Sequence, residues 1–209
     1  MWVVKLGGSL TSSQALRGWL AVLARAGRGR AVIVPGGGPY ADAVRAEQQR
    51  WGFDDSAAHS MALLGMEQYG HQLVAIGNQA ASATFEPART NTELRSALER
   101  GVVPVFIGAH TAEGDASLPR DWSLTSDSLA VWLAHGLNAA ALALVKSVHV
   151  EETESGAAAL VAREWVDARF PELLQDARFQ TRLFGAGQQA LLERALCGDA
   201  RAGLLVTMN

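Results

Sequence analysis

Short apolar runs alternate with longer amphipathic stretches along this sequence of 209 residues. The short runs have the composition of strands buried on both faces, and the longer stretches repeat their apolar residues at helical spacing. This alternation predicts βαβ units and an α/β fold around a mostly parallel sheet. Strands are expected near residues 2–6, 30–34, 102–107, 139–146 and 203–207. Helices are expected at residues 13–26, 40–51, 56–78, 92–100, 126–135, 171–179 and 188–196.

Several element boundaries carry chemical signals of their own. Gly101 is placed to end a helix as a left-handed residue before the next strand. Thr125 and Ser126 can cap the helix that starts beside them, and Asp127 lies in its first turn, where a carboxylate complements the helix dipole. The alanine-rich stretch at residues 156–159 is expected to form a loop or hairpin near the sheet edge.

Composition restricts the class of protein. With 49% hydrophobic and 19% charged residues, the sequence is globular rather than disordered, and its length suits one domain. The net charge of −3 provides no basic field for nucleic acid or an anionic membrane. Neither a signal-peptide pattern nor an apolar run long enough to span a bilayer is present, so we expect a cytoplasmic protein. A single cysteine, Cys197, excludes an internal disulfide.

Lysine is used at only two of the 18 basic positions, Lys5 and Lys146. Each directly follows an apolar run, and open α/β sheets bind ligands at the carboxyl ends of their strands. An ammonium group is a compact point charge that suits phosphate oxygens, whereas guanidinium is a planar fork. The two lysines therefore indicate a phosphate site, with ordinary snorkelling at a strand end as the alternative.

Glycine-rich loops follow the first two predicted strands. The first reads Lys-Leu-Gly-Gly-Ser at residues 5–9, and the second reads Pro-Gly-Gly-Gly-Pro at residues 35–39. Such loops let the backbone approach a ligand closely and can form anion-binding nests. Two nests at adjacent strand ends would hold two anionic groups face to face, as phosphoryl transfer requires. Neither loop matches the P-loop or dinucleotide-binding fingerprint.

These motifs, in this order and spacing, resemble the amino acid kinase family. The resemblance rests on residues 5–9, on residues 35–39 with Asp42, on Thr-Ser-Asp-Ser-Leu-Ala at residues 125–130, and on residues 183–207. It covers nearly the whole chain. The segment at residues 59–69 is similar to the small kinases of methanofuran biosynthesis in archaea and methylotrophic bacteria, which phosphorylate an aminomethylfuran-methyl phosphate to the diphosphate.

The resemblance implies a three-layer αβα sandwich that uses ATP and Mg²⁺. It implies one domain, with an acceptor-binding part at about residues 1–137 and a nucleotide-binding part at about residues 138–209. In the catalytic roles, Lys5 would contact the transferring phosphate, Asp127 would orient the lysines and the phosphate, and Lys146 would neutralise charge near the nucleotide. The ATP site would comprise Gly7, Gly8, Ser9, Lys146 and Ser147, and the acceptor site Gly36, Gly37, Gly38, Asp42 and His59.

The chain also departs from the family pattern. Many relatives carry Thr-Asp followed by Gly near the position of Lys146, and many carry a later Gly-Gly-Met segment with a second catalytic lysine. No lysine follows Lys146 here. Either Lys146 supplies that second charge, or an arginine does so, or the chemistry is slower or lost.

Two of the acceptor-side residues have a structural alternative. His59 could donate to an acceptor phosphate or be an ordinary helix histidine, and Asp42 could bind a substrate amine or complement the helix dipole. Met61, Met66 and Tyr69 recur at helical spacing, which suggests core or a subunit interface and hence a homo-oligomer. The remaining histidines lack metal-ligand spacing, so no protein-built metal site is expected.

The leading hypothesis is a kinase whose acceptor is a phosphate monoester, because an ionised phosphate needs no general base. One alternative is a kinase for a carboxylate, such as acetylglutamate or aspartate, or for a nucleoside or isoprenyl monophosphate. A second alternative is a nucleotide- or oxyanion-binding protein on the same fold that does not catalyse.

Overall fold

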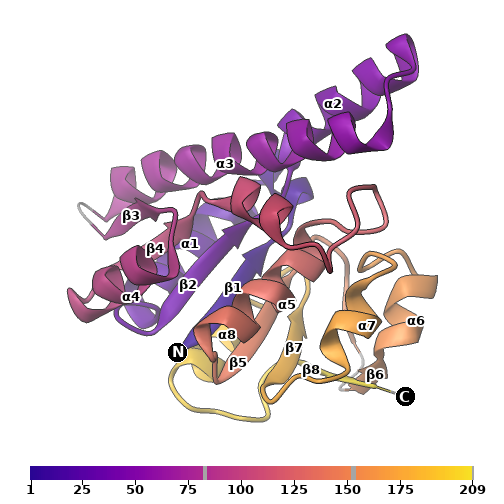
Figure 1. Ribbon diagram of the computed structural model, residues 1–209. Coiled ribbons are helices and arrows are strands. Elements are labelled where there is room, and N and C mark those ends of the chain that lie inside the picture. The colour runs from indigo at the N-terminus through magenta and orange to yellow at the C-terminus, as the bar shows by residue number, and fades with distance from the viewer. Residues whose placement is uncertain (82–83, 152–153, 209) are drawn as a thin grey trace.

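A central sheet runs through the computed structural model, which describes residues 1–81, 84–151 and 154–208 (Figure 1). The described strands form one eight-stranded sheet in the order β3-β4-β2-β1-β5-β7-β8-β6. Its strand pairs are parallel except for β7 with β8. The strands are β1 Trp2–Leu6, β2 Ala31–Pro35, β3 Phe85–Ala88, β4 Val103–Phe106, β5 Ala141–Val145, β6 Glu154–Gly156, β7 Gln180–Phe184 and β8 Leu204–Thr207.

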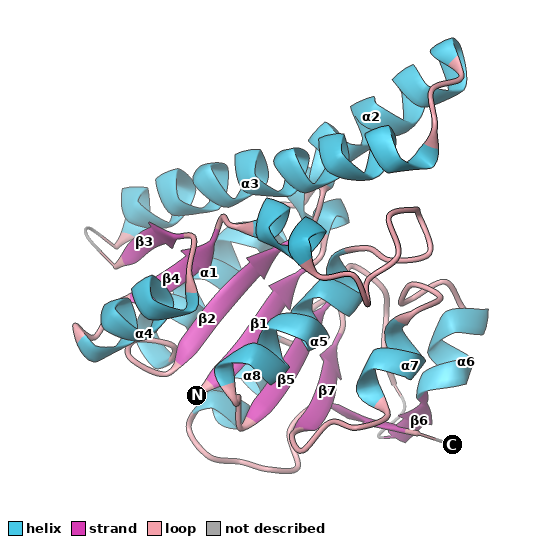
Figure 2. Ribbon diagram, viewed as in Figure 1, coloured by secondary structure: helices cyan, strands magenta, loops and turns pink. Residues whose placement is uncertain are grey.

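Helices cover both faces of the sheet, as Figure 2 shows for α5 on the near face. They are α1 Ala15–Ala26, α2 Gly38–Trp51, α3 Asp55–Ala80, α4 Asn91–Glu99, α5 Ser126–Leu137, α6 Ala157–Ala162, α7 Phe170–Leu174 and α8 Gln189–Leu196. Short 3-10 turns lie at η1 Gly8–Ser12 and η2 Ala109–Gly114. None of the described helices is long and apolar enough to cross a membrane.

Alternate strand residues feed two separate cores, which confirms the expected three layers. Val3 of β1 packs on one face with α4, α5, α6 and α7, whereas Val4 packs on the other face with α1 and α8. Helix α3 contributes to both cores, with Met66 in the first and Tyr69 in the second. That position allows α3 to line the end of the sheet where the candidate ligand loops lie.

Some elements were not expected from the sequence. Strand β3 contains Pro87 and lies at the sheet edge, where the missing N–H of proline is tolerated. Strand β7 was not expected because Arg182 interrupts its apolar pattern. Arg182 is nevertheless buried, and its guanidinium donates to the carbonyl oxygens of Gly203 and Ala200. The unexpected β6 spans only three residues.

The structure decides three expectations about where helices begin and end. Gly101 has φ of 74°, which confirms the left-handed helix end. The expected helix at residues 171–179 ends at Leu174, after which the chain turns and Phe179 packs against the core. The loop or hairpin expected at residues 156–159 is wrong, because α6 begins at Ala157 and alanine strongly favours helix.

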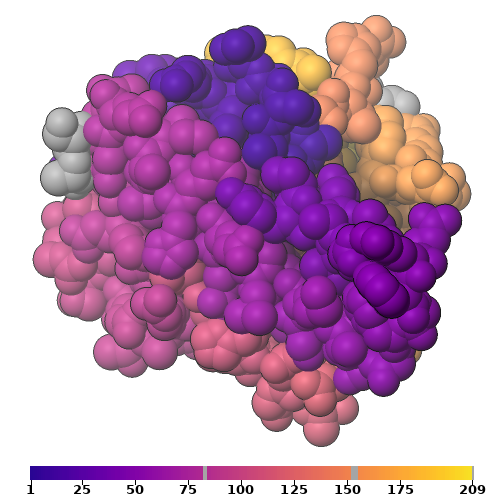
Figure 3. Space-filling model, turned by 90° about the horizontal axis from the view of Figure 1, so that it is seen from above, coloured from indigo at the N-terminus to yellow at the C-terminus, as the bar shows by residue number. Residues whose placement is uncertain are grey.

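The sheet register brings the candidate loops to one edge of the sheet, where the carboxyl ends of the central strands lie. Leu6 at the end of β1 pairs with Pro35 of β2 on one side and Val145 of β5 on the other. The loops that follow these three strands therefore start side by side. Seen from above, the indigo N-terminal segment lies next to orange residues of the C-terminal part (Figure 3).

Candidate active site

Three charged side chains from separate elements meet at this edge of the sheet. The Nζ atom of Lys5, on β1, lies 2.9 Å from Oδ1 of Asp127, in the first turn of α5. The Nζ atom of Lys146, immediately after β5, lies 2.7 Å from the same oxygen and donates a hydrogen bond of 2.8 Å to Oδ2. Lys5 is 3% exposed and Asp127 is 5% exposed, so water screens these charges poorly. The structure thus brings together all three residues expected to be catalytic.

Two ammonium groups share a single carboxylate in this cluster. Burial opposes ionisation of Asp127, but the charges of Lys146 and Lys5 outweigh it and hold the pKa of the carboxyl below its usual value. Burial lowers the pKa of Lys146 to about 8, although Asp127 acts in the opposite direction. The cluster therefore carries surplus positive charge, which an anionic ligand would neutralise.

The two glycine loops pack directly against each other. A Cβ atom on Gly8 would lie 2.5 Å from the backbone nitrogen of Gly38, and one on Gly36 would lie 2.4 Å from that of Gly8. Side chains at these positions would force the loops apart. The N–H of Gly7 donates to Val145 O at 2.9 Å and that of Gly36 to Leu6 O at 2.8 Å, so these two amides extend the sheet and are not available to a ligand.

The hydroxyl groups of Ser9 and Ser147 lie 2.8 Å apart in a hydrogen bond. Ser9 follows β1 and Ser147 follows β5, so this contact joins the first glycine loop to the loop that carries Lys146. Both serines were expected on the ATP side, and the structure places them together.

A cavity of about 270 Å³ opens beside the charged cluster. Its lining combines polar groups from Lys5, Asp127, the glycine loops and the start of α5 with aliphatic side chains. The polar lining comprises Lys5, Gly8, Ser9, Gly37, Gly38, Thr125, Ser126 and Asp127. The aliphatic lining comprises Ala41, Ala62, Leu63, Met66, Leu124 and Leu129, and the remaining lining residues are Asp42, Arg45, His59 and Trp122.

Arg45 organises one part of the cavity lining. Its guanidinium lies 2.9 Å from Oδ1 of Asp42 and 4.3 Å from the ring centre of Trp122. The indole N–H of Trp122 donates to Gln48 Oε1 at 2.7 Å, which fixes the orientation of the ring. Asp42, expected as a candidate for binding an amine, thus lines the cavity but is already paired with Arg45.

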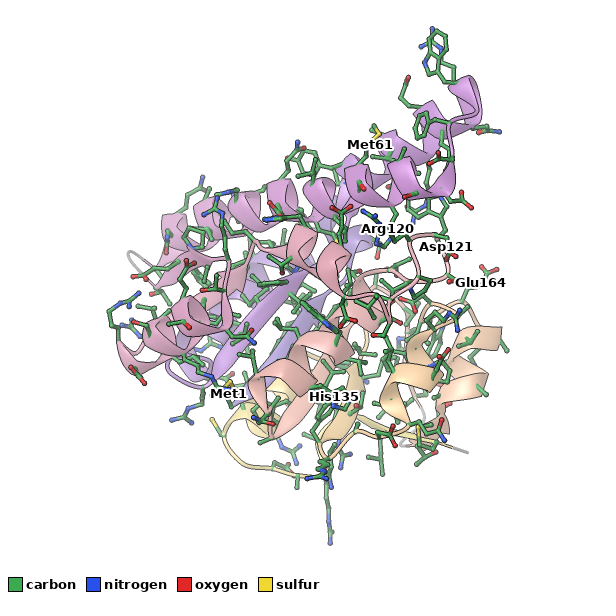
Figure 4. All side chains as sticks on the ribbon, viewed as in Figure 1. Met1, Met61, Arg120, Asp121, His135 and Glu164 are labelled. Carbon is green, nitrogen blue, oxygen red and sulfur yellow. The ribbon has the colours of Figure 1, made fainter. Side chains whose placement is uncertain are left out.

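His59 lies in the cavity wall and is 6% exposed. Burial lowers its pKa, opposed by a hydrogen bond with the backbone of Asp121 and by the charge of Glu113. Figure 4 shows Arg120 and Asp121 on the loop that lies beneath the α2–α3 hairpin. His59 therefore lines the cavity beside this loop, and its role toward an acceptor stays a prediction.

Asp167 caps α5 from outside the helix. Its Oδ2 accepts hydrogen bonds from Thr125 N at 2.9 Å, Thr125 Oγ1 at 2.8 Å and Ser128 N at 3.1 Å, and its Oδ1 accepts from the Ser128 hydroxyl. Thr125 is the N-cap residue, as expected, but its side chain donates to Asp167 and accepts no helix N–H, and Ser126 is already the first residue of the helix.

Sequence reasoning missed three residues of this region. Arg45 follows Asp42 by about one helical turn, and Trp122 precedes Thr125 by three positions, so each was close to a recognised motif. Asp167 carries no comparable signal, because it lies 42 positions from Thr125. Among the described residues no group of three or more acidic, histidine or cysteine side chains could hold a metal ion.

Sequence similarity links part of this chain to a known kinase. The [5-(aminomethyl)furan-3-yl]methyl phosphate kinase of Methanocaldococcus jannaschii is 28% identical over 134 residues, which cover 64% of this chain and 59% of that protein. The matched region thus spans less than two thirds of the relative's length.

Solved structures share the fold across the whole chain. Uridylate kinase from Archaeoglobus fulgidus superposes with a TM-score of 0.70 at 16% identity, covering 99% of both chains. UMP kinase from Bacillus anthracis gives 0.74 at 16% identity, covering 100% of this chain and 96% of the other. Isopentenyl phosphate kinase gives 0.65 at 17% identity, covering 99% and 100%.

A family model supplies the assignment. It is described as the amino acid kinase family, and it matches residues 1–150, the segment that contains both glycine loops, Asp127 and Lys146. Three of the motifs expected to carry the resemblance, at residues 5–9, 35–39 and 125–130, thus fall within the matched segment, whereas residues 183–207 lie outside it. The chain belongs to the amino acid kinase family.

Proposed function

We propose that this chain is an ATP-dependent kinase that phosphorylates a small phosphate monoester. The observation that carries the proposal is the Lys5–Asp127–Lys146 cluster, whose surplus positive charge lies beside a small cavity that residues of both glycine loops line. A buried cationic cluster of this kind stabilises phosphate oxygens and the charge that develops on them during transfer.

The proposed reaction is an in-line transfer. An oxygen of the acceptor phosphate forms a bond to the γ-phosphorus of ATP, the bond from that phosphorus to the bridging oxygen breaks, and ADP leaves. The acceptor oxygen is already ionised, so no general base is required. Lys5 and Lys146 neutralise the transferred group, and Asp127 keeps the two ammonium groups in place.

The ATP site would lie where the loop after β1 meets the loop after β5. Gly8, Ser9, Lys146 and Ser147 would hold its phosphates, and the Ser9–Ser147 hydrogen bond keeps the two loops together there. Mg²⁺ would supply further charge neutralisation, held by phosphate oxygens, since the described residues form no ligand cluster for it.

Lys146 is the best candidate for the charge that the family's later lysine would supply. Its ammonium contacts both oxygens of Asp127, whereas Arg45, which lines the cavity, is engaged by Asp42 and Trp122. This arrangement favours retained catalysis over a chain that only binds nucleotide.

We infer that the acceptor is [5-(aminomethyl)furan-3-yl]methyl phosphate or a close analogue. A cavity of about 270 Å³ suits a phosphate with one small ring, and its aliphatic wall suits an apolar ring face. The phosphate would lie near Lys5 and His59, the ring against Leu63 and Met66, and the ammonium group near Asp42. The relative with this acceptor in its name supports the choice.

The test is release of ADP from the purified chain with ATP, Mg²⁺ and a panel of acceptors. We expect the furan phosphate to give the highest kcat/KM, above isopentenyl phosphate, UMP, acetylglutamate and aspartate. Lys5→Ala should abolish turnover, whereas the exposed Arg25→Ala should not. A carboxylate as the best acceptor, or no acceptor-dependent ADP at all, would refute the proposal.

Self-association stays a prediction. In the expected apolar stripe of α3, Met66 and Tyr69 belong to the core, but Met61 is 41% exposed and the nearby Leu64 is 52% exposed. Figure 4 shows Met61 on the outer side of the helix. Light scattering after size exclusion, compared with a Leu64→Glu variant, would test whether this surface joins two copies.

A further inference from the structure

Asp167 is fastened to the segment that carries Asp127. Its carboxylate accepts four hydrogen bonds, two from Thr125 and two from Ser128. A second link lies two residues further on, where Arg169 N donates to Ser123 O at 3.1 Å. The segment at residues 167–169 thus holds the segment at residues 123–128 by both side-chain and backbone contacts.

The two groups of bonds bracket the catalytic carboxylate. Asp127 lies between Thr125 and Ser128 in the first turn of α5, so fixing those two residues fixes the backbone that carries it. Helix first turns are prone to fray because their N–H groups have no partner within the helix. The side chain of Thr125, the N-cap residue, accepts no hydrogen bond from this turn. Asp167 stabilises the turn instead.

The position of Asp127 matters because it must serve two lysines at once. Its contacts of 2.7, 2.8 and 2.9 Å join it to Lys5 on β1 and to Lys146 directly after β5, so a shift of α5 relative to the sheet would change all three. A shift of about 1 Å in such a group can cost about a hundredfold in rate. The precision of the cluster therefore depends on what holds the first turn of α5.

We propose that Asp167 is a positioning residue for the kinase reaction, which holds the first turn of α5 so that Asp127 meets both lysines. The kinetic part of this inference rests on the proposed function. Asp167 belongs to the part of the chain expected to bind nucleotide, and α5 belongs to the part expected to bind the acceptor, so the same contacts join the two. The Asp167 carboxylate also occupies the position at the α5 N-terminus where an anion could bind. A phosphate group would therefore bind to the lysines and the glycine loops.

The kinetic test compares Asp167→Ala and Asp167→Asn with Thr90→Ala. Thr90 is the matched control because its hydroxyl caps α4 by accepting from Glu93 N, and α4 contributes no residue to the cavity. Asp167→Ala is expected to lower kcat by about ten- to a hundredfold with little change in either KM. Asp167→Asn keeps one carbonyl oxygen for Thr125 and should recover part of that loss, whereas Thr90→Ala should keep wild-type kcat.

A second readout does not depend on turnover. Lys5 and Lys146 are the only lysines of the chain, so lysine labelled with ¹³C and ¹⁵N reports on the two cluster residues alone. Asp167→Ala should shift the side-chain signals of both lysines in the same direction as Asp127→Asn, and Thr90→Ala should leave them unchanged. If the wild-type chain turns over none of the acceptors, the kinase proposal fails while these spectra still decide the role of Asp167.

The inference is overturned by a folded Asp167→Ala variant that melts earlier, as Thr90→Ala does, but keeps wild-type kcat and lysine signals. That outcome would make Asp167 a helix cap and nothing more. Should Asp167→Ala fail to fold, Asp167→Asn takes its place, since it keeps the size of the side chain. Wild-type kcat and lysine signals in a folded Asp167→Asn variant would then overturn the inference as well.

Discussion

The ammonium group of Lys146 contacts both carboxylate oxygens of Asp127, at 2.7 Å to Oδ1 and 2.8 Å to Oδ2. Lys5 reaches Oδ1 from the neighbouring strand at 2.9 Å. Because one carboxylate balances only one of the two ammonium groups, the protonation of Lys146 decides how much positive charge the site offers to phosphate.

The first prediction concerns pH. Burial lowers the pKa of Lys146 to about 8, so its charge is present below that pH and is lost above it. We expect kcat/KM to fall by about tenfold per pH unit on the alkaline side. Lys146→Arg, whose guanidinium stays charged, should remove this limb even if its maximal rate is lower. A wild-type profile that stays flat up to about pH 10 would contradict the role given to Lys146.

Stability should follow the opposite course over the same interval. The pKa of Lys146 in the folded chain lies below its ordinary value of 10.5, so unfolding takes up a proton between about pH 8 and 10.5. The contribution of this residue to the free energy of unfolding therefore rises with pH while activity falls. Urea titrations at several pH values would separate loss of charge from loss of fold.

The second prediction concerns Asp127→Asn. Removing the carboxylate leaves two buried ammonium groups facing each other, and breaking a buried ion pair costs about 3–5 kcal/mol. We expect a loss of that order in the free energy of unfolding, together with loss of turnover. Asp42→Asn is the matched control, because its partner Arg45 is exposed and such pairs contribute less than about 1 kcal/mol. If the two variants lose equal amounts of unfolding free energy, the Lys5–Asp127–Lys146 cluster does not contribute the stability of a buried ion pair.

The third prediction concerns the contact between the glycine loops. A Cβ atom at Gly36 would lie 2.4 Å from Gly8 N and 2.9 Å from Gly8 Cα, and backbone atoms cannot move aside as a flexible side chain can. Gly36→Ala should destabilise the fold by about 1–3 kcal/mol, as overpacking does, and should lower kcat. Gly114→Ala should be neutral or slightly stabilising, because a Cβ atom there would meet no non-neighbouring atom within 4 Å. Wild-type behaviour of Gly36→Ala would mean that the loops are not in contact.

The parts of the fold and site that could be predicted are those with local signals. Apolar runs between helical patterns located the central strands, and their parallel pairing brings Lys5, the glycine loops and Lys146 to one edge whatever the details of the connections. Asp127 could be added because its motif opens a helix at the same edge. These inferences need only the chain direction and the period of the apolar residues.

The parts that could not be predicted depend on partners far away in sequence. Strand β7 is hidden by Arg182, whose charge is tolerated only because carbonyl oxygens near β8 accept from it. Asp167 has the same character, since a lone aspartate between two helices does not reveal that it will cap a third. Such residues are fixed by tertiary hydrogen bonds, and the period of the apolar residues carries no information about them.

The last prediction concerns the choice of acceptor. Trp122 lines the cavity under the guanidinium of Arg45, its indole N–H donates to Gln48, and it has no charged group that could neutralise a phosphate. It can therefore bind an acceptor ring without taking part in the transfer. Aromatic contacts of this kind contribute about 0.5–1.5 kcal/mol, so Trp122→Ala should raise the KM of the furan phosphate about three- to tenfold with kcat nearly unchanged.

An acceptor without a ring should show a smaller rise in KM with Trp122→Ala. Trp51→Ala, at the exposed end of α2, should change neither KM nor kcat. If Trp122→Ala instead lowers kcat equally for all acceptors, the tryptophan supports the loop that leads to Asp127 and does not select the substrate.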